Sequence, residues 1–382
     1  MTNHALGERA GSESYLETVS AELRRLGHEV VFFSTRCGVT AERFRAAGFE
    51  VVDTADRLPP DVDVIHGQHT DTVASVRTRL PHAPLVFAMH SWVIPVEDPV
   101  AELGAAAYLA FNDLTRARLS AHAATSGAEI VRLTQPVTVS YADGIRTQLA
   151  TDSVRAVAVS RRMIAAPERL ARACAEAGIT FEWVGSPERP SVDAREEMRS
   201  ADIVFAVGRT AVEAMAAGRA TFVVDEASLG GWVTPASYAA LEADGFTGHL
   251  TDTGTDGLTE LLVGYDAELG AHARRLAVEH HAVQHHAAAL VDLYLRVADQ
   301  STDLVCPPAM ELLAAERYAL EQRAVRAEWS AAERARELQE VRRELSEVTA
   351  QRDRFRRQRN RARRAATMSK DPSRILGRFR RR

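Results

Sequence analysis

Residues 201–248 read ADIVFAVGRTAVEAMAAGRATFVVDEASLGGWVTPASYAALEADGFTG, and this stretch decides the fold. The apolar run at 203–207 is rich in β-branched and aromatic residues and too short for a helix, so it predicts a buried strand that stops at Gly208. A helix follows, with Thr210 as its expected N-cap. A second apolar run at 220–224 completes a strand, helix and strand unit, from which parallel α/β sheets are built.

The ligand side of such a sheet lies beyond the carboxyl ends of its strands. Gly208, Arg209 and Thr210 stand there, at the start of a helix whose unbonded N–H groups favour an anion. We expect Gly208 to let the backbone approach a phosphate, Arg209 to donate to it, and Glu213 to accept hydrogen bonds from ribose hydroxyls. The same residues also suit an ordinary turn with a solvated arginine. Spacing alone leaves both interpretations open.

The order of these features resembles a known family. GRTAVEAMAAGR at 208–219, then a strand, then GGWVTPASY at 230–238, is similar to the nucleotide-binding half of retaining GT-B glycosyltransferases, which use a nucleotide-activated sugar. The resemblance implies that the turn at Gly208 holds the donor diphosphate and that Glu213 holds the donor ribose. The family usually has a second glutamate eight positions before the first, and this chain has Phe205 there.

Composition limits the class of protein. A chain of 382 residues with 46% apolar residues is long enough for two cores, and no uninterrupted apolar segment has the length of a membrane span. Its three widely separated cysteines fit a reducing compartment, so we expect a cytoplasmic protein. The net charge of −5 conceals an asymmetry, because residues 351–382 carry +12 and the rest carries −17.

The first half alternates short apolar runs with amphipathic stretches, which predicts a parallel sheet. In the family a strand precedes the first glycine loop, and this chain has no room for one, so we expect the N-terminal sheet to lack it or the start to be misassigned. Gly11 and Ser12 belong to a loop that resembles the family's glycine loop near acceptor and donor phosphate; a plain helix cap is the alternative. The strands that we expect in both halves cover residues 29–34, 49–53, 63–66, 85–89, 106–111, 130–134, 155–160, 180–184, 203–207 and 220–224.

Other polar residues follow these strands. His90 ends the run at 85–89, and the family commonly has a histidine near the transferred sugar at this point, so His90 is the candidate catalytic residue; a histidine bonded to backbone is the alternative. Arg161 and Arg162 follow the run at 155–160, where the resemblance places an arginine that clamps the diphosphate, while the family's lysine five residues on is absent.

Two groups of histidines suggest a metal but lack the carboxylate or cysteine partners that would complete a site. They are His66 with His69, and the set His280, His281, His285 and His286 on a helix expected at 268–298. We interpret the second group as an exposed or packed helix face and expect neither a metal nor a cofactor.

The sequence therefore predicts an α/β fold of two Rossmann-like parallel-sheet domains followed by a coiled coil. We expect an acceptor domain at 1–142, a nucleotide-sugar-binding domain at 143–300, a coiled coil at 309–366 and a basic amphipathic tail at 367–382. The coiled coil predicts a homo-oligomer, and the tail predicts recruitment to an anionic membrane surface rather than to nucleic acid.

The resemblance implies a metal-independent, retaining glycosyltransferase that moves a sugar from a nucleotide donor to a glycan or lipid-linked acceptor in cell-envelope or surface glycan assembly. Two other functions stay open. An epimerase of the same fold would change the nucleotide sugar without an acceptor. A non-catalytic scaffold, suggested by the absent first strand, by Phe205 and by the coiled coil, would bind no activated sugar.

Overall fold

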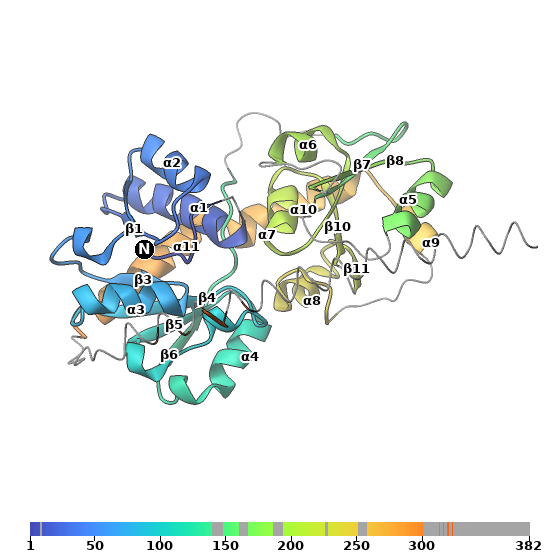
Figure 1. Ribbon diagram of the computed structural model, residues 1–382. Coiled ribbons are helices and arrows are strands. Elements are labelled where there is room, and N and C mark those ends of the chain that lie inside the picture. The colour runs from blue at the N-terminus through green and yellow to red at the C-terminus, as the bar shows by residue number, and fades with distance from the viewer. Residues whose placement is uncertain are drawn as a thin grey trace, which may run out of the picture. The chain divides into compact units, whose positions relative to one another are not determined.

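The computed structural model describes most of residues 1–300 (Figure 1). The described residues are 1–7, 10–139, 148–159, 167–185, 194–225, 228–250 and 258–300, with five single positions between 313 and 323. Arg161, Arg162, the predicted tail and nearly all of the predicted coiled coil lie outside them, so those predictions stay predictions. Among the described residues, no helix has the length and apolar character needed to cross a bilayer.

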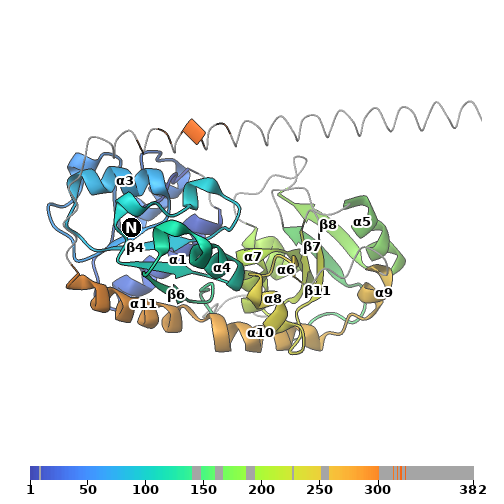
Figure 2. The ribbon, with the colours of Figure 1, turned by 90° about the horizontal axis from the view of Figure 1, so that it is seen from below.

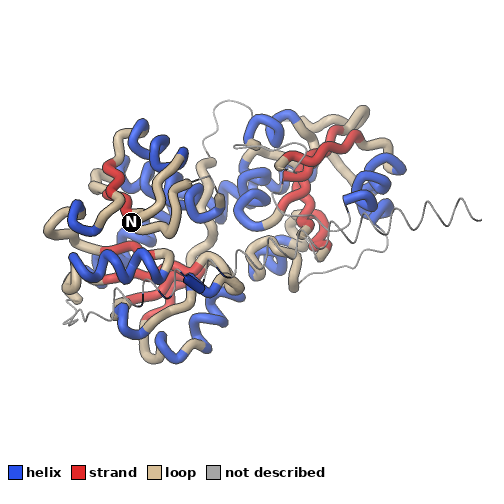
Figure 3. Tube along the Cα trace, viewed as in Figure 1, coloured by secondary structure: helices blue, strands red, loops and turns tan. Residues whose placement is uncertain are grey.

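The N-terminal lobe contains the first six strands. They are β1 (Val31–Phe33), β2 (Glu50–Val52), β3 (Ile65–Gly67), β4 (Leu85–Met89), β5 (Ala107–Ala110) and β6 (Glu129–Arg132). Its helices are α1 (Gly11–Arg25), α2 (Val39–Ala46), α3 (Thr70–Arg79) and α4 (Asp113–Ala121). Every strand pair here is parallel, in a two-stranded sheet β1-β2 and a four-stranded sheet β3-β4-β5-β6. β4 and β5 are buried along their whole length, as expected where helices cover both faces of a parallel sheet (Figure 3).

The first residues of the chain lie between the two N-terminal sheets. The Thr2 amide donates to the His66 carbonyl at 2.9 Å, the Asn3 amide donates to the Phe33 carbonyl at 3.0 Å, and Thr2 forms a parallel bridge with Phe33. β1 and β3 are therefore joined through this stretch and not to each other. Residues 2 and 3 thus form a short bridging segment between the two sheets.

The C-terminal lobe holds one five-stranded sheet in the order β11-β10-β9-β7-β8. Its strands are β7 (Arg155–Val159), β8 (Thr180–Val184), β9 (Ile203–Ala206), β10 (Ala220–Val224) and β11 (Leu229–Trp232). Its helices are α5 (Pro167–Glu176), α6 (Arg195–Ser200), α7 (Gly208–Ala216), α8 (Tyr238–Ala243), α9 (Leu258–Val263) and α10 (Glu268–His281). The predicted strand, helix and strand unit is present as β9, α7 and β10, with β9 and β10 parallel.

The sequence GGW at 230–232 is not the turn that its glycines suggest. It belongs to β11, which pairs antiparallel with β10. A Cβ added to Gly230 would lie 2.9 Å from side-chain atoms of both Leu241 and Val223, so close packing requires the glycine there. A glycine that permits close approach looks the same in a sequence as one that permits a turn, so the glycine pair alone does not distinguish the two.

Two helix starts also differ from prediction. α7 begins at Gly208 with Val207 as its N-cap, so Thr210 lies within the first turn and does not cap the helix. α1 begins at Gly11, which places Gly11 and Ser12 in a helix and not in a loop. The reason lies in Glu13, whose Oε2 accepts from the Ala10 amide at 3.1 Å and so supplies the cap.

The predicted single helix at 268–298 is two helices. α10 ends at His281, α11 (Val283–Ala298) begins two residues later, and Ala282 between them has an extended ψ of 126°. α10 packs against α7 in the C-terminal lobe, whereas α11 packs against α1 in the N-terminal lobe (Figure 2). The chain thus returns to the N-terminal lobe at Ala282. The break is stabilised by long-range backbone bonds that helical periodicity does not reveal, because the Val137 amide donates to His281 and its carbonyl accepts from Val283.

Arg77 on α3 is a buried cation in the N-terminal lobe, with 1% of its surface exposed. Its Nε donates to the Leu103 carbonyl at 2.9 Å, its Nη2 to Gly104 at 3.0 Å, and its Nη1 to Pro81 at 3.3 Å and to Ala83. The guanidinium therefore satisfies carbonyls from two loops.

Replacing this arginine by methionine is expected to lower the free energy of unfolding by about 2–3 kcal/mol, because buried carbonyls lose their donors. Urea denaturation followed by circular dichroism measures the loss. Arg79→Met, at the partly exposed end of the same helix, is the matched control and should change stability by less than about 0.5 kcal/mol. Equal effects of the two variants would contradict a structural role for Arg77.

Candidate functional site

The start of α7 combines a glycine of left-handed conformation with a helix N-terminus. Gly208 has a φ of +56°, in the left-handed region that side chains other than glycine rarely adopt. Its amide donates to the Phe246 carbonyl at 2.9 Å. α7 has nine residues, so its first amides carry the partial positive charge of a full helix N-terminus.

Arg209 and Glu213 are bonded to each other. Nε of Arg209 lies 3.2 Å from Oε1 of Glu213, and both side chains are 8% exposed. The other guanidinium nitrogens donate at 2.6 Å to the Pro136 carbonyl and at 2.6 Å to the Thr18 hydroxyl of α1. The residues predicted to contact phosphate and ribose therefore form one buried ion pair that also joins α7 to α1.

His90 follows β4 and lies in a cluster of aromatic rings. Its ring centroid lies 4.3 Å from that of Phe111, in a stacked arrangement, and 4.8 Å from that of Tyr15. Its amide donates to Oε2 of Glu97 at 2.6 Å. Burial holds the pKa of His90 well below its ordinary value, and the positive charge of Arg209 lowers it further. His90 is therefore neutral at physiological pH and electrostatically coupled to the start of α7.

A second polar group lies at the same edge of the N-terminal sheet. Nδ1 of His4 and Oδ2 of Asp71 are 2.5 Å apart, and the His4 amide donates to Nδ1 of His69 at 3.1 Å. Nε2 of His69 lies 3.9 Å from Oε1 of Glu97. Burial lowers the pKa of His69 to about 4, whereas the bond to His4 lowers the pKa of Asp71 against the opposing effect of its burial. No local sequence pattern signals the pair of His4 and Asp71, because these residues are 67 positions apart in the chain.

Several buried polar atoms at this edge have no hydrogen-bond partner among the described residues. Buried polar groups in folded proteins are nearly always bonded to protein, water or ligand, so such a set indicates a place where hydroxyl-bearing molecules bind. All are contributed by the first residues, by β3 and the start of α3, or by the segment after β4. The atoms are Asn3 Oδ1, His66 Nε2, Gln68 Oε1, Asp71 Oδ1 and His90 Nε2.

The remaining predicted site residues are Gly11, Ser12, Thr210, Arg161 and Arg162. Gly11 is exposed at the start of α1, and the Ser12 hydroxyl donates to Oε2 of Glu13 at 3.1 Å. Thr210 lies in the first turn of α7, within the helix N-terminus predicted to bind phosphate. Arg161 and Arg162 lie outside the described residues.

Three contacts between the lobes were not predicted. The rings of Trp92 and His249 lie 5.2 Å apart, Asn112 leaves no space for a side chain at Gly245, and Thr18 accepts from Arg209. Asn112 carries a local signal, since it follows β5 directly and caps α4 by accepting from the Thr115 amide at 2.8 Å. The others depend on the distance between two lobes, which local sequence patterns do not contain.

The histidine-rich region has a structural role. Nδ1 of His281 donates to the Gln135 carbonyl at 2.8 Å, and Nδ1 of His286 donates to the Thr134 carbonyl at 3.0 Å. Nε2 of His281 accepts from the Tyr238 hydroxyl at 3.0 Å, and Nε2 of His286 accepts from the Tyr15 hydroxyl at 3.2 Å. Both histidines therefore bind the segment that links β6 to the C-terminal lobe. In the part of the chain that the structure describes, no three metal-ligating side chains are grouped.

Comparisons with known proteins support the fold. No protein-family model matches the chain, and no curated protein matches its sequence. Among solved structures, Alr3699/HepE from Anabaena in complex with UDP and glucose superposes with a TM-score of 0.54 at 13% identity, over 77% of this chain and 98% of that one. The same protein in complex with UDP-glucose gives a TM-score of 0.51 at 13% identity, over 76% of this chain and 98% of that one. The chain therefore has the GT-B glycosyltransferase fold that its sequence resembles.

Proposed function

We propose that the protein is a glycosyltransferase that moves a sugar from a nucleotide diphosphate donor to an acceptor hydroxyl. The observation that carries the proposal is the GT-B fold shared with a protein that binds UDP and UDP-glucose. In a doubly wound fold, ligands bind at the carboxyl ends of the parallel strands. Both the start of α7 and the buried polar atoms after β3 and β4 lie at such ends.

The donor part of the proposal rests on α7. Its N-terminus offers backbone amides and a left-handed Gly208 to a diphosphate, and the Arg209 guanidinium is already held beside it. Glu213 is the proposed ribose ligand, with its carboxylate oriented by Arg209. Arg161 and Arg162 are proposed as further diphosphate contacts from the sequence alone.

The acceptor part rests on the N-terminal lobe. Oδ1 of Asp71 and Oε1 of Gln68 accept hydrogen bonds, and an acceptor sugar would supply the hydroxyl donors. His90 is neutral, so its Nε2 suits a hydrogen bond to a sugar hydroxyl better than it suits a role as a fixed cation. We further propose a retaining, metal-independent reaction on a glycan or lipid-linked acceptor, since the sequence resembles retaining enzymes.

The donor proposal is tested by titrating UDP, UDP-glucose and a panel of other nucleotide sugars into the full chain in a calorimeter. We expect at least one nucleotide sugar to bind, and Glu213→Gln to weaken that binding roughly tenfold, because a charged hydrogen bond contributes about 1.5 kcal/mol or more. Unchanged affinity in Glu213→Gln would contradict the ribose role. The absence of binding across the panel, with EDTA and with Mg²⁺, would contradict the proposed function.

The proposed transfer to an acceptor is tested by analysis of the reaction product. Incubation of the preferred donor with acceptor sugars should give a product that mass spectrometry detects, and NMR of its anomeric proton reports retention or inversion. Asp71→Asn should raise the KM for the acceptor while the donor affinity from calorimetry stays unchanged. Conversion of the donor to a stereoisomer without acceptor would indicate an epimerase.

A further inference from the structure

The segment after β4 folds back on itself through one buried carboxylate. It runs from His90 to Asp98 and contains the 3₁₀ turn η2 (Pro95–Glu97). Glu97 is 2% exposed, and its Oε2 accepts from the amides of His90 and Ser91, each at 2.6 Å. Two successive amides that point at one atom form a concave arrangement that binds anions. In this chain the bound anion is the Glu97 carboxylate.

The far end of this segment is fixed to two helices. The Thr70 hydroxyl, at the start of α3, lies 2.8 Å from the Val96 carbonyl oxygen and 2.9 Å from that of Asp98. The Asp98 carboxylate accepts from Nε of Arg118 on α4 at 2.9 Å. Glu97 lies between these attachments, so its side chain connects a fixed part of the lobe to the main chain at the end of β4.

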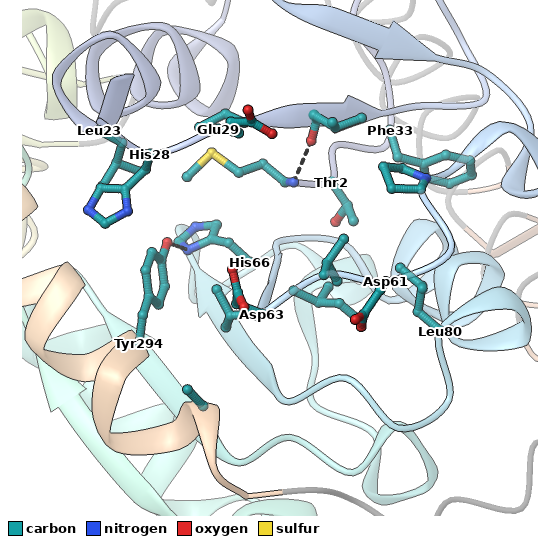
Figure 4. Close-up of a pocket in the computed structure, with 18 of the residues that line it drawn as sticks. Thr2, Leu23, His28, Glu29, Phe33, Asp61, Asp63, His66, Leu80 and Tyr294 are labelled. Carbon is teal, nitrogen blue, oxygen red and sulfur yellow. Dashed lines mark hydrogen bonds between the residues drawn. The ribbon is translucent and has the colours of Figure 1, made fainter. Parts of the chain in front are cut away.

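The ring of His90 is fixed separately, by packing. It contacts Tyr15 of α1 edge to face, and Tyr15 stacks on His66 with ring centroids 5.7 Å apart. A hydrogen bond of 2.8 Å joins Nδ1 of His66 to the hydroxyl of Tyr294 on α11. Figure 4 shows this hydroxyl pointing toward the His66 ring, where both residues line a pocket between β1 and β3. The surrounding rings therefore hold the His90 ring, whereas Glu97 holds its main chain.

The same segment reaches the C-terminal lobe. Trp92 follows His90 by two residues, and its ring centroid lies 5.2 Å from that of His249. Nε2 of His90 is buried and has no hydrogen-bond partner among the described residues. The segment therefore carries both a ring nitrogen that suits a ligand hydroxyl and a contact between the lobes. Glu97 fixes the main chain at the point from which both extend.

The tip of the segment has little packing of its own. Val93 is 54% exposed, and Pro95 is exposed as well. Loops with few buried apolar contacts open locally at low free energy. A group that acts on a substrate must be held to within about 0.5 Å, and a displacement of about 1 Å can lower a rate roughly a hundredfold. The two bonds to Glu97 therefore limit how far the main chain of His90 can move.

We propose that Glu97 is a positioning residue for the transfer reaction. Its carboxylate accepts from two successive amides and so keeps the His90 side chain, and Trp92 beyond it, at the place where the two lobes meet. Glu97 acts through His90 and contacts no substrate itself. The assignment rests on the proposed glycosyltransferase function, because His90 is the residue proposed to bond a sugar hydroxyl.

Three variants of the full chain separate the hydrogen bonds of Glu97 from its charge and its size. Glu97→Gln keeps a carbonyl oxygen that can accept from both amides but loses the charge. Glu97→Met keeps the length of the side chain and loses the acceptor. Glu102→Gln, at an exposed position in the next 3₁₀ turn, is the matched control for a change of charge. We measure kcat and KM with the product assay, donor affinity by calorimetry, and hydrogen exchange of the amides of residues 90 and 91.

We expect Glu97→Met to lower kcat roughly 30-fold or more and to change the dissociation constant of the donor less than about twofold. Glu97→Gln should keep at least about a third of kcat, and Glu102→Gln should match the unmodified chain. The amides of residues 90 and 91 should exchange about tenfold faster in Glu97→Met than in the unmodified chain. If Glu97→Met does not fold, Glu97→Asp replaces it, because the shorter side chain keeps the charge but withdraws the acceptor from the two amides.

A double-mutant cycle separates positioning of His90 from a general structural role. In a His90→Ala background, Glu97→Met should lower kcat by less than about threefold further, since the residue through which it acts is already removed.

An unchanged kcat in Glu97→Met, or in Glu97→Asp in its place, would overturn the proposal. So would a loss in Glu97→Gln as large as that in Glu97→Met, because the charge would then be responsible, and so would an equal loss with and without His90. These outcomes leave the proposed function intact. Absence of transfer by the unmodified chain would instead overturn the proposed function, and this assignment with it.

Discussion

The folded chain should lose roughly 8 kcal/mol or more of unfolding free energy when the pH falls from 7.5 to 5. Four buried histidines each contribute about 2 kcal/mol, and the buried His90 side chain and Met1 amine, whose pKa values burial also lowers, act in the same direction. Burial lowers the pKa of His66 and His286 to about 3 and that of His69 and His281 to about 4. A total of this size is comparable to the whole stability of a typical domain, about 5–15 kcal/mol.

The sign of this pH dependence follows from which state, folded or unfolded, binds more protons at a given pH. Above pH 6.5, the ordinary value, these histidines are neutral in both the folded and the unfolded chain, so their contribution is constant. Below it the unfolded chain binds protons that the folded chain excludes, and stability falls until the folded pKa values of about 3 to 4 are reached. Burial raises the pKa of Glu13, which acts in the opposite direction but involves one group.

Urea denaturation at intervals from pH 8 to pH 5 measures this dependence. His281→Gln with His286→Gln removes two of the buried titrating groups while retaining amide donors, and it should reduce the slope below pH 6.5 by roughly a third. His280→Gln, a more exposed neighbour with 38% of its side chain accessible, is the matched control and should leave the slope unchanged. A flat stability profile down to pH 5 would contradict burial of the neutral histidines.

Arg209→Met should lower the free energy of unfolding by about 3–5 kcal/mol, because it removes one partner of a buried ion pair. The side chains of Arg209 and Glu213 are both 8% exposed, and the guanidinium also donates to Thr18 and Pro136. The variant therefore loses the Glu213 interaction and two bonds that join α7 to other segments. Chemical denaturation at pH 7.5 measures the effect.

A double-mutant cycle separates these contributions. Glu213→Gln in the Arg209→Met background should restore part of the lost stability, because a neutral amide is buried at lower cost than a carboxylate. Thr18→Val removes the hydroxyl that accepts from Arg209 and donates to the Ser14 carbonyl, and it should cost about 1 kcal/mol. If Arg209→Met destabilised the chain no more than Thr18→Val does, the ion pair would be without structural importance.

The sequence located the strands well because each is a short apolar run bounded by polar residues or glycine. β4, β8 and β10 begin and end where predicted. The failures have particular causes. β11 contains two glycines that serve close packing against Leu241, and the break at Ala282 depends on backbone bonds to a segment that lies far away in the sequence.

The candidate site was predictable only where a local pattern encodes it. The predicted strand does end before Gly208, which has a left-handed conformation, and His90 directly follows β4 as its run predicts. Pairing between Arg209 and Glu213 follows helical spacing, since the residues are four apart, although the prediction assigned each to the ligand instead. Contacts such as His4 with Asp71 are set by tertiary packing and were missed.

The break at Ala282 has a mechanical consequence. The chain passes between the lobes twice, and the two passages are fastened together by the bridge from Val137 to Ala282 and by the carbonyl bonds of His281 and His286. Because both described passages meet at one place, we expect motion of one lobe against the other to occur mainly as rotation about that point. Two parallel, bonded segments would then permit opening by an angle and resist separation by translation.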